Sequence, residues 1–187
     1  MPVDFRLERA DRARRLLAHL PGGVQRAMYR AINRAIVAAR TSMSKQIRRK
    51  YKIPAKIVRP SFRVRKATRS KLGASLDGKG LRLPLAEFGP RPSEPGTGGA
   101  GKPDMRVKVR KDTGRAKPVP GGFVARKGLV ARRKGKERTP LEFLYGPAVP
   151  QMAGNEDVLA GVEERAQAVL DKRLDHEVDF ELRRAAK

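Results

Sequence analysis

A glycine-rich stretch is the first place in this chain where residue spacing suggests chemistry. Residues 96–102 match the pattern G-x-x-x-x-G-K, in which backbone N–H groups and the lysine surround the phosphates of a nucleotide. Pro103 stands where the pattern needs a magnesium-binding serine or threonine. No buried strand is predicted before the motif, and no helix is predicted after it. Residues 89–103 are dense in glycine and proline, so we predict a flexible loop without a nucleotide site.

The two histidines are the next candidates. His176 has Asp175 and Asp179 nearby, but three ligands on one helix cannot converge on a metal ion without ligands from elsewhere. His19 is near the end of a basic helix, where we expect a surface position. The chain has no cysteine, and no nucleophile elbow or H-E-x-x-H motif is present. We therefore predict no catalytic residue, no metal and no cofactor.

Positive charge is the most informative property of the composition. The 187 residues carry a formal net charge of +25 at pH 7. Residues 1–50 contain 13 basic and 3 acidic residues, residues 51–140 contain 25 and 6, and residues 141–187 contain 6 and 10. Such an excess repels itself within one domain and attracts polyanions or acidic protein surfaces. The sequence therefore indicates a negatively charged partner, either DNA or protein.

Three groups of cations are candidates for contact with such a partner. One ends a long N-terminal helix, one alternates along a predicted strand, and one is at a turn or strand end. A basic run at a helix end also stabilises the helix dipole, and basic turns are often only solvated, so contact and solvation both stay open. The candidates are Lys45, Arg48, Arg49, Lys50, Arg106, Lys108, Arg110, Arg132, Arg133 and Lys134.

Apolar periodicity predicts the elements that position these residues. Over residues 24–47 apolar residues recur every three or four positions, which is typical of a helix with one apolar stripe. We predict N-terminal helices within residues 5–58, a β-rich region over 61–152 that includes loop 89–103, and a C-terminal helix over 155–186. The expected fold is a single α+β domain in which the long N-terminal helices and the C-terminal helix pack on a small, mainly antiparallel β-sheet.

Two patterns within the β-rich region predict particular strands. Residues 105–110 alternate strictly, which predicts a strand with three apolar side chains on one face and three cations on the other. Residues 72–76 and 81–85 flank a glycine-containing turn and predict a β-hairpin.

The C-terminal helix is predicted to begin at Asn155, because asparagine favours the N-cap and acidic residues follow it. Asp171, Asp175 and Asp179 share one face at i, i+4 spacing, which is mildly unfavourable in an isolated helix. Two interpretations stay open: a solvated face that neighbouring cations compensate, or a surface that docks a basic patch on a neighbouring copy.

The segment before this helix combines β-prone runs with an unusual closing motif. Gly128 can provide the positive φ that a tight hairpin connection requires. The last run ends at Gly146-Pro147, because proline has no N–H to donate to a neighbouring strand. We predict that residues 144–152 are a packing or docking element in which Tyr145 is a buried aromatic anchor. Its expected members are Tyr145, Gly146, Pro147, Val149, Pro150 and Met152.

Four fragments in order resemble the prophage minor tail protein Z family of long-tailed bacteriophages. The most specific is the basic strand followed by R-T-P-L at residues 138–141 and by the closing motif at 144–152. The resemblance covers roughly residues 22–152, although loop 89–103 has no matching motif. The upstream fragments are residues 31–35 (AINRA), residues 65–68 (RKAT) and a run that ends at residues 84–88 (PLAEF).

The resemblance implies a structural virion protein: a minor tail or tail-completion component at the head-proximal, or neck, end of the tail, needed for tail assembly and head–tail joining. Because tails of this kind are sixfold tubes, it also implies a ring of copies, a hexamer by analogy, around the DNA channel. Tail terminator, tail tube or head–tail connector proteins are the implied neighbours. We expect synthesis in the bacterial host cytoplasm and no membrane partner, since no membrane-length apolar run or signal-peptide core is present.

A free nucleic-acid-binding protein of ribosomal or nucleoid type is the alternative. Its main support is the content of 44 lysines and arginines, since non-specific phosphate binding needs little else. Only 5% of residues are aromatic and none is tryptophan, so platforms for base stacking are scarce. Salt-sensitive DNA binding by the isolated chain would favour this alternative, whereas ring assembly with tail proteins would favour the virion role.

Overall fold

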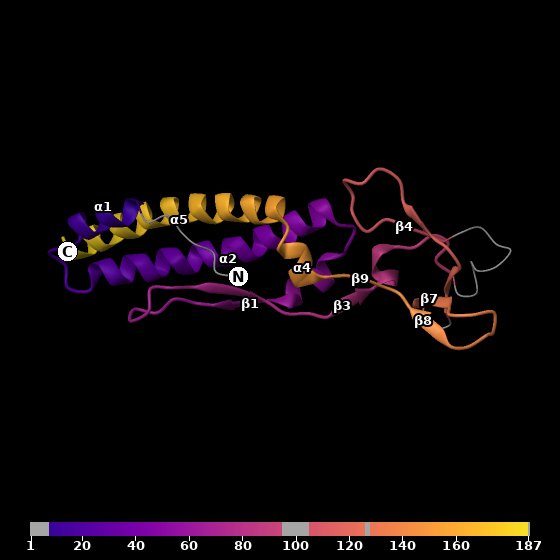
Figure 1. Cartoon of the computed structure of the whole chain (residues 1–187). Helices are drawn as coiled ribbons and strands as arrows, with labels where there is room; N and C mark the ends of the chain where they lie inside the picture. The colour runs from indigo at the N-terminus through magenta and orange to yellow at the C-terminus, as the bar shows by residue number, and fades with distance from the viewer. Residues whose placement is uncertain (1–7, 95–104, 126–127, 187) are drawn as a thin grey trace. The chain divides into compact units, whose positions relative to one another are not determined.

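The computed structural model describes residues 8–94, 105–125 and 128–186 (Figure 1). The phosphate-loop-like stretch, residues 96–102, lies outside these ranges. The helices are α1 (Glu8–Leu16), α2 (Gly23–Lys50), α3 (Ala55–Val58), α4 (Val149–Ala153) and α5 (Glu156–Ala185), with 3-10 helices η1 (Arg59–Ser61) and η2 (Leu85–Phe88). The strands are β1 (Phe62–Arg65), β2 (Ser75–Gly78), β3 (Arg82–Pro84), β4 (Met105–Val107), β5 (Lys117–Val119), β6 (Gly122–Val124), β7 (Val130–Arg133), β8 (Leu141–Phe143) and β9 (Tyr145–Ala148).

The predicted α+β class is confirmed, and so are the long helices toward both ends of the chain. The strands pair in antiparallel fashion, but in four small sheets rather than one: β1–β2, β3–β9, β4–β5 and β6–β7–β8. The predicted hairpin between residues 72–76 and 81–85 is wrong, since β2 pairs with β1 and β3 pairs with β9. Gly128 has φ +73°, which confirms the predicted turn geometry.

The chain divides into two compact units that alternate along the sequence. The first lies within Met1–Gln46, Phe62–Lys79 and Asn155–Lys187, and the second within Ile47–Ser61 and Gly80–Gly154. The single-domain organisation stays a prediction.

Helix-on-helix packing forms the core of the first unit. The predicted stripe of α2 is buried from Met28 to Ile47, while Val24 is half-buried, and Ala27, Ala31 and Ala35 extend the buried surface. In Figure 1 α5 lies beside α2. The helix that approaches α5 most closely is α1, whose buried Ala13 and the adjoining Leu17 belong to the same core. The apolar core of the first unit also contains buried side chains of α5, among them Leu170, Leu174 and Val178.

Asn33 connects two of the sequence fragments that carry the family resemblance. Its Nδ2 donates to the carbonyl oxygen of Ala67 at 3.0 Å, and the Ala67 N–H donates to Asn33 Oδ1 at 2.7 Å. One side-chain amide thus satisfies both polar groups of a partly buried stretch of backbone that follows β1. The fragments at residues 31–35 and 65–68 therefore belong to one structural feature.

Replacing Asn33 with alanine is expected to destabilise the protein by about 1–3 kcal/mol, because the Ala67 N–H and carbonyl groups lose their partner. Urea denaturation followed by circular dichroism measures the change. Arg34→Ala is the matched control, since Arg34 is exposed on the same turn of helix. An equal loss of stability in both variants would contradict the proposed role of Asn33.

The second unit is built on short strands around a small apolar core. Phe88 is fully buried, as are Met105 and Met152. The predicted strand over residues 105–110 is shorter in the structure: β4 ends at Val107, and Arg110 forms only an isolated bridge with Tyr51. After Val107 the chain no longer pairs with β5, because it instead contacts the residues that follow α2. There the Lys52 N–H donates to the Val109 carbonyl at 2.9 Å.

Candidate interaction surfaces

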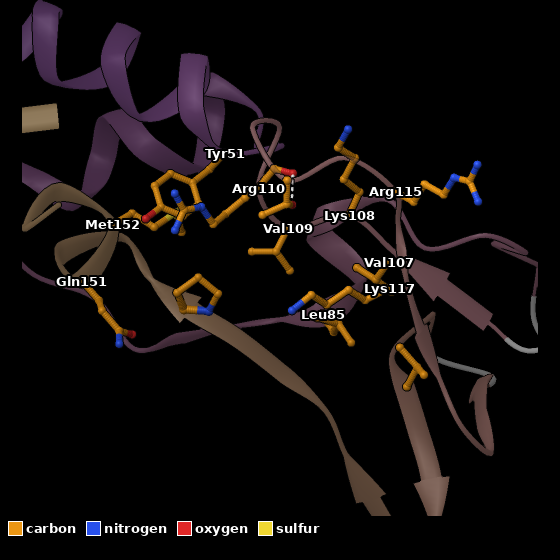
Figure 2. A pocket seen from close by; sticks show the side chains of 13 residues that line it. Tyr51, Leu85, Val107, Lys108, Val109, Arg110, Arg115, Lys117, Gln151 and Met152 are labelled. Atoms are coloured by element: carbon orange, nitrogen blue, oxygen red, sulfur yellow. Dashed lines mark hydrogen bonds between the residues drawn. The ribbon is translucent and has the colours of Figure 1, made fainter. Parts of the chain in front are cut away.

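The described part of the second unit contains a cavity of about 450 Å³ (Figure 2). Its lining is mainly apolar and comes from four parts of the chain: the segment after α2, the start of η2, the β4–β5 region and the β9–α4 connection. The apolar and aromatic members are Tyr51, Leu85, Val107, Val109, Val119, Pro147 and Met152. We refer to this cavity as the β4–β5 pocket.

The register of β4 and β5 places Lys117 beside Val107, and both residues line the pocket. In the β4–β5 sheet, Val107 pairs with Lys117, and Met105 pairs with Val119.

Pro118 lies on the outer edge of the same sheet. The Arg106 N–H and carbonyl groups both hydrogen-bond to Arg91, so Pro118, the residue opposite Arg106 on β5, has its nitrogen on the outer edge. Proline is tolerated there because no ladder hydrogen bond is lost.

The cations around the β4–β5 pocket differ in their partners. The Lys108 ammonium donates to the Gly114 carbonyl at 2.9 Å, and Arg110 Nε donates to the Asp112 carboxylate at 2.9 Å. The hydrogen bonds from Arg110 hold the pKa of Asp112 below its usual value. Lys117 makes no side-chain hydrogen bond or ion pair to any residue in the part of the chain that the structure describes.

Figure 2 shows the Lys117 side chain extending from β5 into the pocket, whereas the side chain of Arg115 is directed away from it. Lys117 is therefore the cation best placed to meet a negatively charged group inside the pocket. Sequence reasoning missed it, because Lys117 precedes a proline and belongs to no basic run.

The structure separates the predicted basic residues. Arg106 is exposed on β4, while Lys108 and Arg110 line the β4–β5 pocket, so the expected single charged face is wrong. The physical reason is that strand alternation stops at Val107. Lys45, Arg48 and Arg49 are exposed near the end of α2, and Lys50 is half-buried. The third group, Arg132, Arg133 and Lys134, is exposed on and after β7.

Part of this third group is neutralised within the chain. Arg132 Nε donates to Glu142 on β8 at 2.7 Å, and this hydrogen bond lowers the pKa of Glu142. The β7–β8 register places the two residues opposite each other, as cross-strand ion pairs require.

The closing motif, residues 144–152, is a packing element, but its buried members differ from the expected one. Tyr145 is 48% exposed, so its prediction as a buried anchor is wrong. Side chains alternate along a strand, and the next residue, Gly146, is the one that lies against Phe88. Val149 and Met152 are buried as core residues. A docking role for the exposed Tyr145 stays a prediction.

The acidic face of α5 also divides into two parts. Asp175 and Asp179 are exposed, and Asp171 is half-buried and accepts a hydrogen bond from Gln167 at 3.0 Å. Their contact with a neighbouring copy stays a prediction.

The carboxylates that bind α2 are different residues, which sequence reasoning missed. Glu181 is only 1% exposed and accepts hydrogen bonds from Arg26 at 2.8 Å and from Arg30 at 3.1 Å. Glu177 accepts a longer bond from Arg30 at 3.4 Å. The position of Glu181 in the sequence could have indicated its burial. Glu181 follows Val178 by three residues, so it lies on the same face of α5 as the buried apolar residues.

Glu181 remains ionised in this setting. Burial acts to raise its pKa, but the hydrogen bond and charge of Arg26, with the charge of Arg30, outweigh burial and leave the pKa lowered. Arg26, Arg30 and Glu181 therefore form an ion-pair network between α2 and the C-terminal part of α5.

Neither a metal-binding cluster nor a membrane-spanning helix is present among the described residues. No three histidine, aspartate or glutamate side chains there converge in a way that could hold a metal ion. None of the helices in the same ranges combines the length and apolar character of a membrane span.

Comparison with known proteins identifies the family. A family model described as prophage minor tail protein Z matches residues 9–187. No curated protein matches the chain, and no solved structure matches it. The family match extends beyond the fragments at residues 22–152 and includes α5, whose ion pairs join it to α2. The chain belongs to the prophage minor tail protein Z family, a family of structural proteins of bacteriophage tails.

Proposed function

We propose that this minor tail protein acts at the head-proximal end of the tail, where a ring of copies surrounds the DNA channel and makes the tail competent to join a head. Family membership over nearly the whole chain is the observation that carries the proposal. It favours a virion role over a free nucleic-acid-binding protein. Six copies are proposed, because the tail tube is sixfold by analogy.

The charge balance supports a role in a larger assembly. Even if each of the 19 acidic residues neutralised one of the 44 lysines and arginines, 25 cations would have no counterpart within the chain. Such a surplus destabilises an isolated protein and favours contact with polyanions or acidic proteins. The exposed cations of α2, β4 and β7 are the proposed contacts with DNA in the lumen or with acidic neighbours.

Contacts between copies and with neighbours are assigned to two exposed features. The aspartates of α5 that are exposed, Asp175 and Asp179, are proposed to contact a basic patch on the next copy. Tyr145 is proposed to contact a tail terminator, tail tube or head–tail connector protein, because an exposed tyrosine combines apolar area with a hydrogen-bonding hydroxyl.

Replacing Tyr145 with serine is expected to leave the melting temperature nearly unchanged and to reduce the yield of complete particles by about tenfold, because an aromatic contact is often a binding hot spot. Plaque titres and thermal denaturation provide the two readouts. Gln25→Ala, at an exposed position of α2 in the first unit, is the control. A Tyr145→Ser phage with a normal titre would contradict the docking role.

Head–tail joining can be tested directly. A phage that lacks this gene is expected to release filled heads and separate tails, and purified protein added to that lysate is expected to restore joined particles. Joined particles in the absence of the protein would reject the proposed function. Tails that remain incompetent after addition, although the purified chain is folded, would also count against it.

A further inference from the structure

We propose that the β4–β5 pocket binds an acidic peptide segment of another protein, with a large apolar side chain of that segment inside the pocket and a carboxylate bound by Lys117. This inference rests on the proposed function only for the source of the segment, a neighbour in the tail or neck. Peptide binding itself can be measured without a phage particle.

The shape and lining of the pocket favour an inserted side chain. Its volume of about 450 Å³ exceeds what a single side chain fills, so a residue and part of its backbone can enter. Leu85, Val109 and Val119 are half-buried at its surface and would lose further contact with water on binding. Burying an aromatic or large aliphatic side chain against such residues is a principal source of affinity.

The position of Lys117 specifies the charge of the ligand. Its side chain points into the pocket, is exposed to solvent and has no partner among the described residues. Lys108 and Arg110 already donate to oxygens of their own chain. A peptide that fills the pocket excludes water around Lys117, and the attraction between the ammonium group and a carboxylate strengthens as the local dielectric constant falls. A carboxylate next to an apolar group therefore satisfies both features of the site.

Duplex DNA fits this site less well. Its exposed negative groups are phosphates on a hydrophilic backbone, and its bases are stacked, so it offers no apolar side chain for the pocket. Pro118 also shapes recognition: the outer edge of β5 lacks an N–H at this position, so a bound peptide cannot fully extend the sheet. The ligand is therefore recognised through its side chains.

Fluorescence anisotropy with the full-length protein and two labelled peptides tests the inference. One ten-residue peptide contains aspartates and glutamates around a central phenylalanine, and the other has serine in place of phenylalanine. Salt of about 0.15 M limits the Debye length to about 8 Å, which suppresses non-specific charge attraction. Lys117→Glu is the test variant. Lys66→Glu is its matched control, since Lys66 is an exposed lysine of the first unit.

The phenylalanine peptide is expected to bind at least about tenfold more tightly than the serine peptide, which is the effect of about 1.4 kcal/mol from apolar burial. Lys117→Glu is expected to weaken the binding of the phenylalanine peptide by about tenfold or more. Lys66→Glu is expected to change the dissociation constant of the same peptide by less than about twofold. Val119→Ser is expected to remove most of the preference for phenylalanine without changing the net charge. Circular dichroism checks that each variant is folded.

Several results would overturn the inference. Equal weakening by Lys117→Glu and Lys66→Glu would show attraction to net charge alone, and equal affinity for the two peptides would show that the pocket is unused. Displacement of the peptide by duplex DNA in a Lys117-dependent manner would identify a nucleic-acid site, and self-association that Lys117→Glu abolishes would identify a second copy as the occupant. Peptide binding by a chain that fails to restore head–tail joining would reject the proposed function and leave this inference standing.

Discussion

Replacing Glu181 with alanine is expected to destabilise the first unit by about 3 kcal/mol. Removal of one partner from a buried ion pair leaves the other charge uncompensated, which typically costs about 3–5 kcal/mol. The expected value is at the lower end because Arg26 and Arg30 are 23% and 32% exposed and keep some contact with water. Both arginines would also lose the acceptor that holds them over the surface of α5.

Urea denaturation followed by the helical signal in circular dichroism measures this loss. Glu177→Ala is the matched control, because Glu177 is on the same helix and makes only a 3.4 Å contact with Arg30. A loss of stability for Glu181→Ala no larger than for Glu177→Ala would mean that the network of Arg26, Arg30 and Glu181 does not stabilise the fold.

The same network has a defined pH dependence. Because folding lowers the pKa of Glu181, its contribution is fully present above the ordinary glutamate pKa of 4.5 and is lost as pH falls through the lowered value. The stability difference between the wild type and Glu181→Gln is therefore expected to shrink when pH is reduced below 4.5. Denaturation curves at neutral and acidic pH measure it, and a difference that grows on acidification would have the wrong sign.

Replacing Gly146 with alanine is expected to destabilise the second unit by about 1–3 kcal/mol through overpacking. A Cβ at this position would lie 2.4 Å from Cε2 of Phe88, and Phe88 is fully buried and has little room to move. The strand pair β3–β9 would have to shift to admit one methyl group. This glycine is required by close approach and not by an unusual φ.

Gly114→Ala is the control for Gly146→Ala, since no atom lies within 4 Å of the Cβ that it would add. A double variant tests the mechanism: Phe88→Leu shortens the clashing ring, so it is expected to cost less stability in the Gly146→Ala background than in the wild type. Strictly additive losses, or a Gly146→Ala variant as stable as Gly114→Ala, would contradict the packing explanation.

Elements with a strong local period could be predicted from the sequence. The stripe of α2 is confirmed from Met28 to Ile47, and α5 begins after Asn155 as predicted, although the Asn155 side chain makes no cap hydrogen bond. Periodic burial and the acidic residues of a first helical turn both act within a few turns of the chain. The pairing of β3 with β9 was not predicted, since it joins residues about sixty positions apart and no local turn chemistry indicates it. The false hairpin at residues 72–76 and 81–85 has the same cause.

The candidate sites were harder to predict for a related reason. The exposed basic residues follow from composition, but the β4–β5 pocket requires segments around Tyr51, Leu85, Lys117 and Met152 to meet. Glu181 was missed because acidic residues are normally assigned to solvent, and only the arginines of α2 explain its burial.

Cryo-electron microscopy of the neck of purified virions tests the central claim most directly. The proposed function predicts a ring of density at the head-proximal end of the tail into which the two units, fitted separately, both dock, with cations of α2, β4 or β7 facing DNA or acidic neighbours. A well-resolved neck in which other proteins account for all of the density would contradict a stable structural role at that position.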